Sequence, residues 1–540
     1  MAENMRYVQI KNVSSGLALD ISQGSEPKPV TQRTSDPNAD SQRWNITVVD
    51  GSDNLCLLEN ARNDQVLAPG PGPDDWNIVF QPKGETPKRQ WRLAPLGENV
   101  YYIQNPYSSP VRVLEVDGSS KDVGALIAQY QKNQPATANQ QWNITPSSSP
   151  YLPYYIQTGG SGWAWGRDSR GQLGIASTGD QPRPVEVDFP RSVTAKAIAV
   201  AAGYEHSLAM LDDGSVWAWG RGENGRLGNG QTGDQSTPVE VDFPRSVTAK
   251  AIAVAAGWDH SLAALDDGSV WAWGYGGQGR LGNGQAVDQS RPVEVDFPRS
   301  VTAKAIAVDG GWMYSLAALD DGSVWAWGGG GEGELGNGQT GDQSTPVEVD
   351  FPRSVTANAI AVAAGGYHSL ALLDDGSVWA WGGGGQGQLG NGQQANQSTP
   401  VEVDFPRSVT ANAIAVAAGW LHSLAALGDG SVWAWGDRSY GQLGIGQTTV
   451  DQSRPVEVDF PRSVTAKALA VAAGSWHSLA LLDDGSIWAW GRGENGRLGN
   501  GQTDDQSKPV QVVDLLRGKE AIAVAAGEFH SLACDGVLWH

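Results

Sequence analysis

Hydrophobic and polar residues alternate in four short runs between residues 196 and 243, and turn residues separate the runs. The runs are KAIAVAA (196–202), HSLAML (206–211), SVWAWG (215–220) and PVEVDF (238–243). A period of two is typical of strands with one buried face. The tripeptide DDG at 212–214 fits a tight hairpin, because Asp-Gly adopts a positive φ at little cost. This segment therefore predicts a four-stranded antiparallel sheet.

The same pattern repeats to the end of the chain at a spacing of 54 residues, with one extra residue in the sixth unit. The tetrapeptide WAWG marks each unit, beginning at Trp163, Trp217, Trp271, Trp325, Trp379, Trp433 and Trp488. Gly and Pro interrupt every window that could form a long helix. Seven units of four strands predict an all-β, seven-bladed β-propeller over residues 162–540.

The repeat begins with the third strand of one unit and ends with the first two strands of another. The final pair, at 520–526 and 530–534, is expected to complete a blade with the first pair and so hide the open edges. Two segments, 162–166 and 537–540, compete for the third strand of that blade. The sequence does not choose between them.

A second, weaker repeat occupies residues 1–146. Three copies begin at Tyr7, Leu55 and Tyr101 and close on a tryptophan, in SQRWNI, KRQWRL and NQQWNI. Three such all-β units suit a compact three-fold barrel. Residues 147–161 are rich in Pro, Ser and Gly and are interpreted as a linker.

Charge and composition narrow the function classes. The chain carries a formal net charge of −22, most of it after residue 150, so a nucleic acid is not expected as a partner. No apolar run is long enough for a membrane-spanning helix, so membrane insertion is not expected either. Cys56 and Cys534 do not form a disulfide framework. The N-terminus shows no signal peptide, which favours the cytoplasm or export without such a signal.

The N-terminal repeat resembles the ricin B-type lectins through the Q-x-W motifs at Gln42–Trp44 and Gln140–Trp142 and the related RQW at Arg89–Trp91. The resemblance implies a β-trefoil that binds a glycan through a carboxylate, a stacking aromatic ring and an amide pair. The third copy matches best, with Glu115, Tyr130, Asn139 and Gln140. The first copy keeps Asp20 and Gln42 but has Ser41 and Gln32 at the other places, and the second copy looks inactive.

The C-terminal repeat resembles the regulator of chromosome condensation family through the blocks GQLG or GRLGNG, AAGxxHSLAL and DGSVWAWG. The resemblance implies the propeller fold strongly and the function weakly, because propellers of this family do unrelated work. The eukaryotic namesake is a nucleotide exchange factor on chromatin, a role that this acidic chain does not favour. The chain looks closer to bacterial propellers that inhibit β-lactamases through aromatic-rich loops.

The loop between the first two strands of each blade varies in only two residues, and one of them is always aromatic. These aromatics are Tyr204, Trp258, Trp312, Tyr367, Trp420, Trp476 and Phe529. The loop between the third and fourth strands varies too, whereas the loops expected at the opposite face are nearly constant. Exposed aromatics mark interaction sites, so this face is predicted to bind a partner, and a protein is the expected class. The alternative is that the rings fold inward and plug the channel.

A histidine recurs in register in six units, and Tyr314 takes its place in the third. A histidine fixed by the same neighbours in every unit is interpreted as a structural hydrogen-bonding residue. The aspartate pairs are interpreted as turn residues. We therefore expect no catalytic activity, no metal and no cofactor.

The sequence favours a lectin-like protein with a second, protein-binding face. One alternative is a self-assembling scaffold with an inactive lectin site. Others are a defensive inhibitor or toxin-like lectin and an enzyme with its site in the propeller channel.

Overall fold

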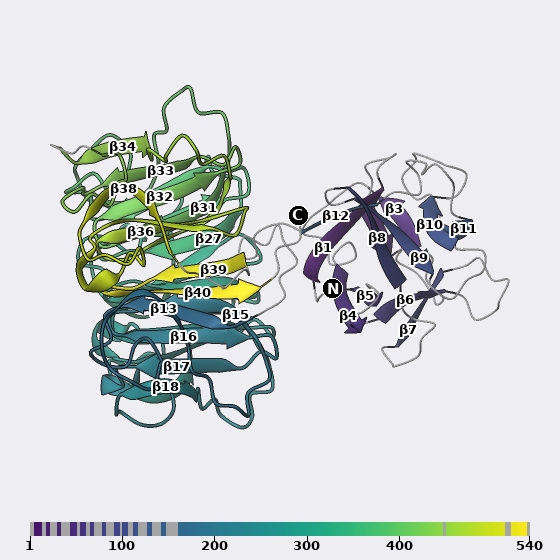
Figure 1. Cartoon of the computed structure of the whole chain (residues 1–540), viewed down its shortest axis with the longest axis horizontal. Coiled ribbons are helices and arrows are strands. Elements are labelled where there is room, and N and C mark those ends of the chain that lie inside the picture. Colours follow the sequence, from purple (N-terminus) through teal and green to yellow (C-terminus); the bar gives the residue numbers. More distant parts are fainter. Residues whose placement is uncertain are drawn as a thin grey trace. The chain divides into compact units, whose positions relative to one another are not determined.

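The computed structural model describes residues 160–446, 450–513 and 520–536 in full, and the backbone of twelve strands within residues 5–146. Contacts divide the chain into two compact units, one from Met1 to Gln157 and one from Thr158 to Leu538. Figure 1 shows both units as assemblies of strands.

The twelve N-terminal strands belong to one hydrogen-bonded system. They are β1 (Met5–Asn12), β2 (Ala18–Ile21), β3 (Val30–Arg33), β4 (Trp44–Asp50), β5 (Leu55–Asn60), β6 (Gln65–Pro69), β7 (Ile78–Pro82), β8 (Trp91–Gly97), β9 (Val100–Asn105), β10 (Arg112–Val116), β11 (Ile127–Gln131) and β12 (Trp142–Pro146). Strands β1, β4, β5, β8, β9 and β12 pair in turn, and β12 pairs with β1, so these six close a ring. The other six form three antiparallel pairs, β2–β3, β6–β7 and β10–β11.

The second unit consists of seven four-stranded antiparallel sheets, which confirms the predicted seven-bladed propeller. The innermost strands, here called A, are β15 (Ala197–Ala202), β19 (Ala251–Ala256), β23 (Ala305–Gly310), β27 (Ala359–Ala364), β31 (Ala413–Ala418), β35 (Ala468–Ala473) and β39 (Glu520–Ala526). The B strands are β16 (His206–Leu211), β20 (His260–Leu265), β24 (Tyr314–Leu319), β28 (His368–Leu373), β32 (His422–Leu427), β36 (His477–Leu482) and β40 (His530–Gly536).

The C strands carry the WAWG repeat, and the D strands form the outer edge. The C strands are β17 (Val216–Gly220), β21 (Val270–Gly274), β25 (Val324–Gly328), β29 (Val378–Gly382), β33 (Val432–Gly436), β37 (Ile487–Gly491) and β13 (Gly162–Gly166). The D strands are β18 (Gln235–Glu240), β22 (Gln289–Glu294), β26 (Gln343–Glu348), β30 (Gln397–Glu402), β34 (Gln452–Glu457), β38 (Gln506–Gln511) and β14 (Gln181–Glu186). Three 3₁₀ turns, η5 (Glu223–Gly225), η6 (Gly277–Gly279) and η7 (Glu494–Gly496), lie in the C–D loops of blades 1, 2 and 6.

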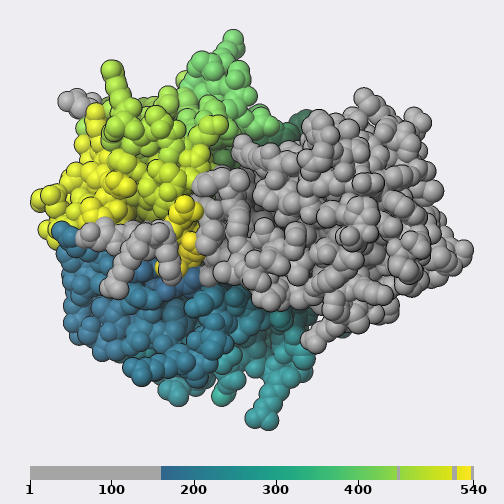
Figure 2. All heavy atoms as spheres, turned by 45° about the vertical axis from the view of Figure 1, so that its right-hand side comes forward, coloured from purple at the N-terminus to yellow at the C-terminus, as the bar shows by residue number. Residues whose placement is uncertain are grey.

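Blades are numbered from β15–β18, so blade 7 joins the two ends of the repeat. Its sheet runs β14–β13–β40–β39, as the sequence predicted. Segment 162–166 takes the third position, and residues 537–540 lie outside the described residues. Figure 1 shows the yellow β39 and β40 beside the blue β13. In Figure 2 yellow atoms from the C-terminal part of the propeller lie next to blue atoms from its beginning.

The D strand lies three residues earlier than the alternation predicted. In blade 1 the ladder covers Gln235–Glu240, whereas the sequence suggested 238–243. The reason is Phe243, which leaves the sheet and packs edge-on against Trp271 and Trp273 of blade 2. The ring is partly buried there and packs against the core between the two blades.

A set of polar contacts joins each blade to the next. The second tryptophan of each WAWG is fully buried, and its Nε1 donates to a carbonyl in the C–D loop of the preceding blade, as Trp273 does to Arg226. The B-strand serine Ser261 donates its hydroxyl to the same carbonyl. Each blade boundary therefore combines apolar burial with satisfied polar groups.

Candidate functional site

The A–B and C–D loops emerge on the same face of the propeller. In blade 1 the amide of Arg221 in the C–D loop donates to the carbonyl of Glu205 in the A–B loop, and Gly329 bonds Met313 in blade 3 in the same way. The two variable loops predicted from the repeats therefore form one surface, which we call the variable face.

The seven aromatics of the A–B loops form one connected cluster on this face. Tyr204 stacks on Trp258 with ring centroids 4.2 Å apart and also contacts Phe529 at 5.4 Å. Trp258 of blade 2 reaches Trp420 of blade 5 at 4.8 Å, so the cluster crosses the propeller axis. The remaining contacts within the set join Trp258 to Trp312, Trp312 to Tyr367 and Trp420, Tyr367 to Trp420, and Trp420 to Trp476.

All seven rings are partly exposed, and none is buried within a blade. The sequence left two arrangements open, an exposed aromatic face and rings folded inward, and the structure has features of both. The rings turn toward the axis and pack on one another, and together they keep a continuous aromatic surface open to solvent. Such a surface is a feature of interaction sites.

Backbone hydrogen bonds hold the A–B loops beside one another. The amide of Trp258 donates to the carbonyl of Gly311, and the amides of Trp312, Gly366 and Glu528 make the equivalent bond to the glycine of the next loop. A side chain at these glycines would clash, since a Cβ on Gly203 would lie 2.5 Å from the carbonyl oxygen of Gly257. The glycine thus allows the loops to approach closely and brings the aromatics together.

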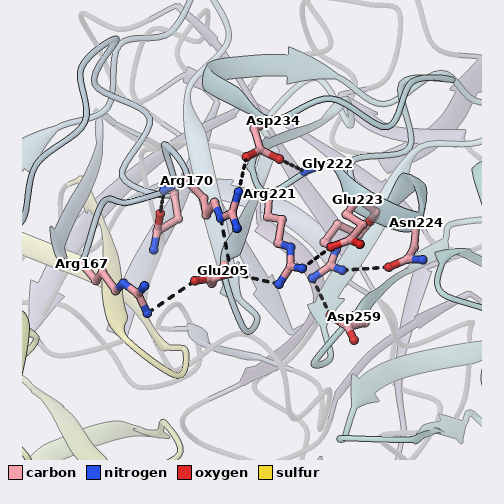
Figure 3. A network of polar contacts seen from close by, with 11 residues as sticks. Arg167, Arg170, Glu205, Arg221, Gly222, Glu223, Asn224, Asp234 and Asp259 are labelled. Atoms are coloured by element: carbon pink, nitrogen blue, oxygen red, sulfur yellow. Dashed lines mark hydrogen bonds and ion pairs between the residues drawn. The ribbon is translucent and has the colours of Figure 1, made fainter.

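An arginine-rich network surrounds Glu205, which is 4% exposed. Figure 3 shows its carboxylate between Arg167 and Arg170 of blade 7 and Arg221 of its own blade, at 3.5, 3.9 and 3.1 Å. Next to it, Arg226 forms an ion pair of 2.5 Å with Asp259 of blade 2. These contacts lock the C–D loop of one blade to the A–B loop of the next.

The residue before each LG of the C–D loops is buried in every blade. This position holds Gln172, Arg226, Arg280, Glu334, Gln388, Gln442 and Arg497. Sequence reasoning missed it, although the changing residue in the otherwise constant G-x-LG was a visible signal. Arg280 and Arg497 each donate from Nη1 to an A–B loop carbonyl of the next blade, at 2.8 Å. Burial raises the pKa of Glu334 to about 7, and the nearby acids Glu332 and Asp342 also raise it.

The recurring histidines are structural, as the sequence predicted. His206, His260, His368, His422, His477 and His530 are fully buried, and each Nε2 lies 2.7 to 3.0 Å from a serine hydroxyl of the following blade. Each serine donates to a carbonyl, so Nε2 carries the proton and donates to the serine. Burial lowers the pKa of these rings, to about 3 for His368 and about 4 for His422, and keeps them neutral.

The residues predicted to bind a glycan belong to the N-terminal unit. Asp20 lies in β2, Glu115 in β10 and Tyr130 in β11, and the β10–β11 register sets Tyr130 opposite Val113. Gln42, Asn139 and Gln140 lie outside the described residues. In the part of the chain that the structure describes, no group of three metal-ligating side chains gathers. No helix there is long and apolar enough to span a bilayer.

The two units of the chain match two different protein families. Residues 163–533 match the family model of the RCC1-like domain. The chain belongs to the RCC1-like domain family. Residues 2–72, 53–130 and 87–174 match the ricin-type beta-trefoil lectin domain-like model, so a ricin B-type domain precedes the RCC1-like domain.

Curated relatives share the RCC1-like domain. The mouse E3 ubiquitin-protein ligase HERC2 is 32% identical over 432 residues, 78% of this chain but 8% of HERC2. The ultraviolet-B receptor UVR8 of Arabidopsis thaliana is 32% identical over 354 residues, 65% of this chain and 77% of UVR8.

Solved structures show the same propeller. Human WBSCR16 is 25% identical with a TM-score of 0.61, covering 70% of this chain and 99% of that one. Yeast RCC1 (Prp20), solved bound to Kap60, is 25% identical with a TM-score of 0.62, covering 72% and 91%.

Proposed function

We propose that this chain is a non-catalytic, lectin-like protein that binds a glycan with its N-terminal unit and a protein with the variable face of its RCC1-like domain. The observation that carries the second part is the aromatic cluster. Seven rings from seven blades converge on one face and remain partly exposed. They lie in loops that differ from blade to blade, while the opposite loops are nearly constant in sequence. Tyrosine and tryptophan are the usual anchors of protein interfaces.

The lectin part rests on the match to the ricin-type family and on the strand pairing. A ring of six strands with three hairpins is the arrangement from which we infer a β-trefoil. We assign the glycan to Glu115, Tyr130, Asn139 and Gln140, with Asp20 and Gln42 as a second site. A sugar needs an apolar ring face and polar groups that pair with its hydroxyls.

Solved relatives support a protein partner for the propeller. Yeast RCC1 was solved bound to Kap60, and a second structure of Prp20p reports its binding to Gsp1p and histones. Those partners belong to those proteins. What transfers to this chain is the use of an RCC1-like domain as a protein-binding platform.

The lectin part is tested with a glycan array on the full chain and on Tyr130→Ala. We expect the wild type to select a narrow set of glycans and the variant to lose them. Gln65→Ala, a change in the second copy that looks inactive, serves as the control. Equal array signals for wild type and Tyr130→Ala would refute this assignment.

The protein-binding part is tested with the triple variant Trp258→Ala, Trp312→Ala and Trp420→Ala. Proteins crosslinked to the wild-type chain in its native extract should disappear with the variant, while glycan binding and the elution volume of the folded chain stay unchanged. A partner that remains bound would place the interface elsewhere.

One observation favours a second candidate, a response to ultraviolet light. Trp258, Trp312 and Trp420 contact one another with centroids 4.8 to 6.2 Å apart, and a relative with 32% identity is an ultraviolet-B receptor. Indole rings this close share their excitation. Irradiation of the purified chain, followed by size-exclusion chromatography, tests this, and an unchanged elution profile would exclude it.

A further inference from the structure

Trp312, Tyr367 and Trp420 form a triangle within the aromatic cluster. Their ring centroids lie 5.1 to 5.3 Å apart, and each ring contacts the other two. The flanking C–D loops of blades 3 and 4 begin with glycine runs at 328–331 and 382–385. We call this part of the variable face the blade 3–4 sector.

Elsewhere on the variable face the chain supplies its own cation to the loop aromatics. Arginine guanidinium groups lie 4.7 to 5.3 Å from ring centroids in four pairs, which are Arg167–Phe529, Arg280–Tyr275, Arg492–Tyr440 and Arg497–Phe529. Among the described residues, none lies over the triangle. Arg280 approaches it from blade 2 but bonds the backbone carbonyl of Trp312.

The blade 3–4 sector carries carboxylates without a cationic partner. Glu332 and Asp342 are exposed and Glu334 is buried, and none of the three forms an ion pair within the described residues. The carboxylate of Glu332 accepts a hydrogen bond from the side-chain amide Nδ2 of Asn396. At the same boundary in blades 1 and 6, the amide and the acid are exchanged, as in Asn224–Asp288 and Asn495–Asp180. The exchange moves the acid of the pair to the C–D loop of blade 3, where it acts on Tyr367.

The loops around the triangle carry glycines at exposed positions. Gly331 and Gly385 are exposed, and a Cβ built on either would meet nothing within 4 Å. Met313 of blade 3 and Leu421 of blade 5 stand where blades 1 and 2 have the acids Glu205 and Asp259. A partner segment can therefore approach the rings without a side chain in its path.

We propose that the blade 3–4 sector binds an exposed segment of a partner protein through an arginine or lysine side chain, which lies over the Trp312–Tyr367–Trp420 triangle and pairs with the exposed Glu332, while the buried Glu334 adds to the negative field. A cation over aromatic rings gains from their negative faces, and the carboxylates add direct attraction. The cation of the partner would lie over the aromatic rings here, as arginines of the chain itself do at blades 2, 6 and 7. This identification of the partner's chemistry rests on the proposed protein-binding function.

Electrostatics within the sector agree with this geometry. Burial raises the pKa of Tyr367, and the nearby Glu332 and Glu334 raise it further. The two carboxylates therefore lie close enough to the triangle to interact electrostatically with Tyr367. Glu332 and Asp342 add to the burial that raises the pKa of Glu334. An incoming cation relieves this repulsion.

The experiment selects random display peptides on the full chain, with counterselection on Trp420→Ala to keep those that need the triangle. Each selected peptide is synthesised with its arginine replaced by citrulline or its lysine by norleucine. Affinities are measured for wild type, Glu332→Gln/Glu334→Gln and the control Glu223→Gln, an acid of the same face that already pairs with Arg221. Glutamine occupies the Glu334 position in three other blades, so the double variant is compatible with the fold.

We expect the Trp420-dependent peptides to share an arginine or lysine. Both the neutral peptide and the double variant should weaken binding by about tenfold, with little further loss when combined. Glu223→Gln should bind as the wild type does. Trp420-dependent peptides without a cation, or unaffected by the double variant, would overturn this inference and leave the proposed function intact. If no peptide depended on Trp420, both would fail.

Discussion

At the scale of single residues, one serine per blade joins three groups across a boundary. Ser315 donates to the carbonyl of Arg280 and accepts from Nε2 of His260, and Nε1 of Trp327 donates to the same carbonyl. All of these side chains are buried. Removal of the serine hydroxyl would leave Nε2 of His260 without a partner and the Arg280 carbonyl with one donor instead of two.

We therefore expect Ser315→Ala to lower the free energy of unfolding by about 1–3 kcal/mol, since the buried N–H of His260 loses its acceptor. Urea unfolding followed by tryptophan fluorescence measures it. Ser246→Ala, a change at an exposed serine, should leave the midpoint unchanged. Equal midpoints for both variants would contradict this role.

Some residue roles followed from the sequence and others needed coordinates. The histidines recur with the same neighbours, which predicted a structural role. The pairing of Glu332 with Asn396 was not predictable, because the two residues are far apart in sequence and meet only when two C–D loops are placed side by side. Glu115 and the other predicted glycan-binding residues stay predictions.

At the scale of elements, blade 7 differs from the others in how its B and C strands are joined. In blade 1 a hairpin joins them, and Trp217 bonds Ser215 of that hairpin. In blade 7 no covalent turn joins β40 to β13. Instead Asp535 accepts from Nε1 of Trp163 at 2.9 Å and from the amide of Ser161 at 2.7 Å. In blade 7 the fully buried carboxylate of Asp535 thus connects the B and C strands, which a hairpin joins in blade 1.

Asp535→Ala should therefore open the ring at blade 7 before the rest of the propeller unfolds. We expect faster amide hydrogen exchange in β13, β14, β39 and β40 and a lower melting temperature, because a noncovalent junction loses two hydrogen bonds. Ser215→Ala removes the matching tryptophan acceptor in a blade with a hairpin and serves as the control. Uniform exchange across all blades in Asp535→Ala would refute this junction.

At the scale of the whole molecule, the repeat predicted the propeller because period-two alternation and a fixed spacing determine blades directly. The sequence also indicated that the aromatics gather near the axis. The sequence could not decide whether the rings are exposed on the face or fill the central channel, since that depends on how seven loops pack around the axis. Trp258 meeting Trp420 across the ring shows that both occur together.

The six buried histidines also set a pH dependence for the whole propeller. Their folded pKa values are lowered, so the unfolded chain binds more protons below pH 6.5, and stability falls as the pH drops from 6.5 toward 4. Burial raises the pKa of Asp168 and Asp309 to about 6 and that of Glu334 to about 7, which opposes the loss between pH 7 and 4. Burial also raises the pKa of Asp451 and Glu528. The six histidines outnumber these five carboxyls, so the net change is a loss.

Urea unfolding between pH 7 and 4 measures this loss. His260→Tyr, with the residue that blade 3 uses at the same position, should reduce the slope by about 1.4 kcal/mol per pH unit. Glu334→Gln should make acid more harmful, because it removes one opposing group. Identical slopes in all three proteins would contradict the assignment.

The closure of blade 7 has a consequence for how the chain is made. Strands β13 and β14 leave the ribosome before the other propeller strands, yet their neighbours β39 and β40 leave it last. During synthesis the tryptophan-rich β13 has no sheet to join and presents an unpaired edge while six blades form behind it. Completion of the propeller therefore waits for its final residues, and a nascent chain truncated before Glu520 would keep that edge open to chaperones or to another chain.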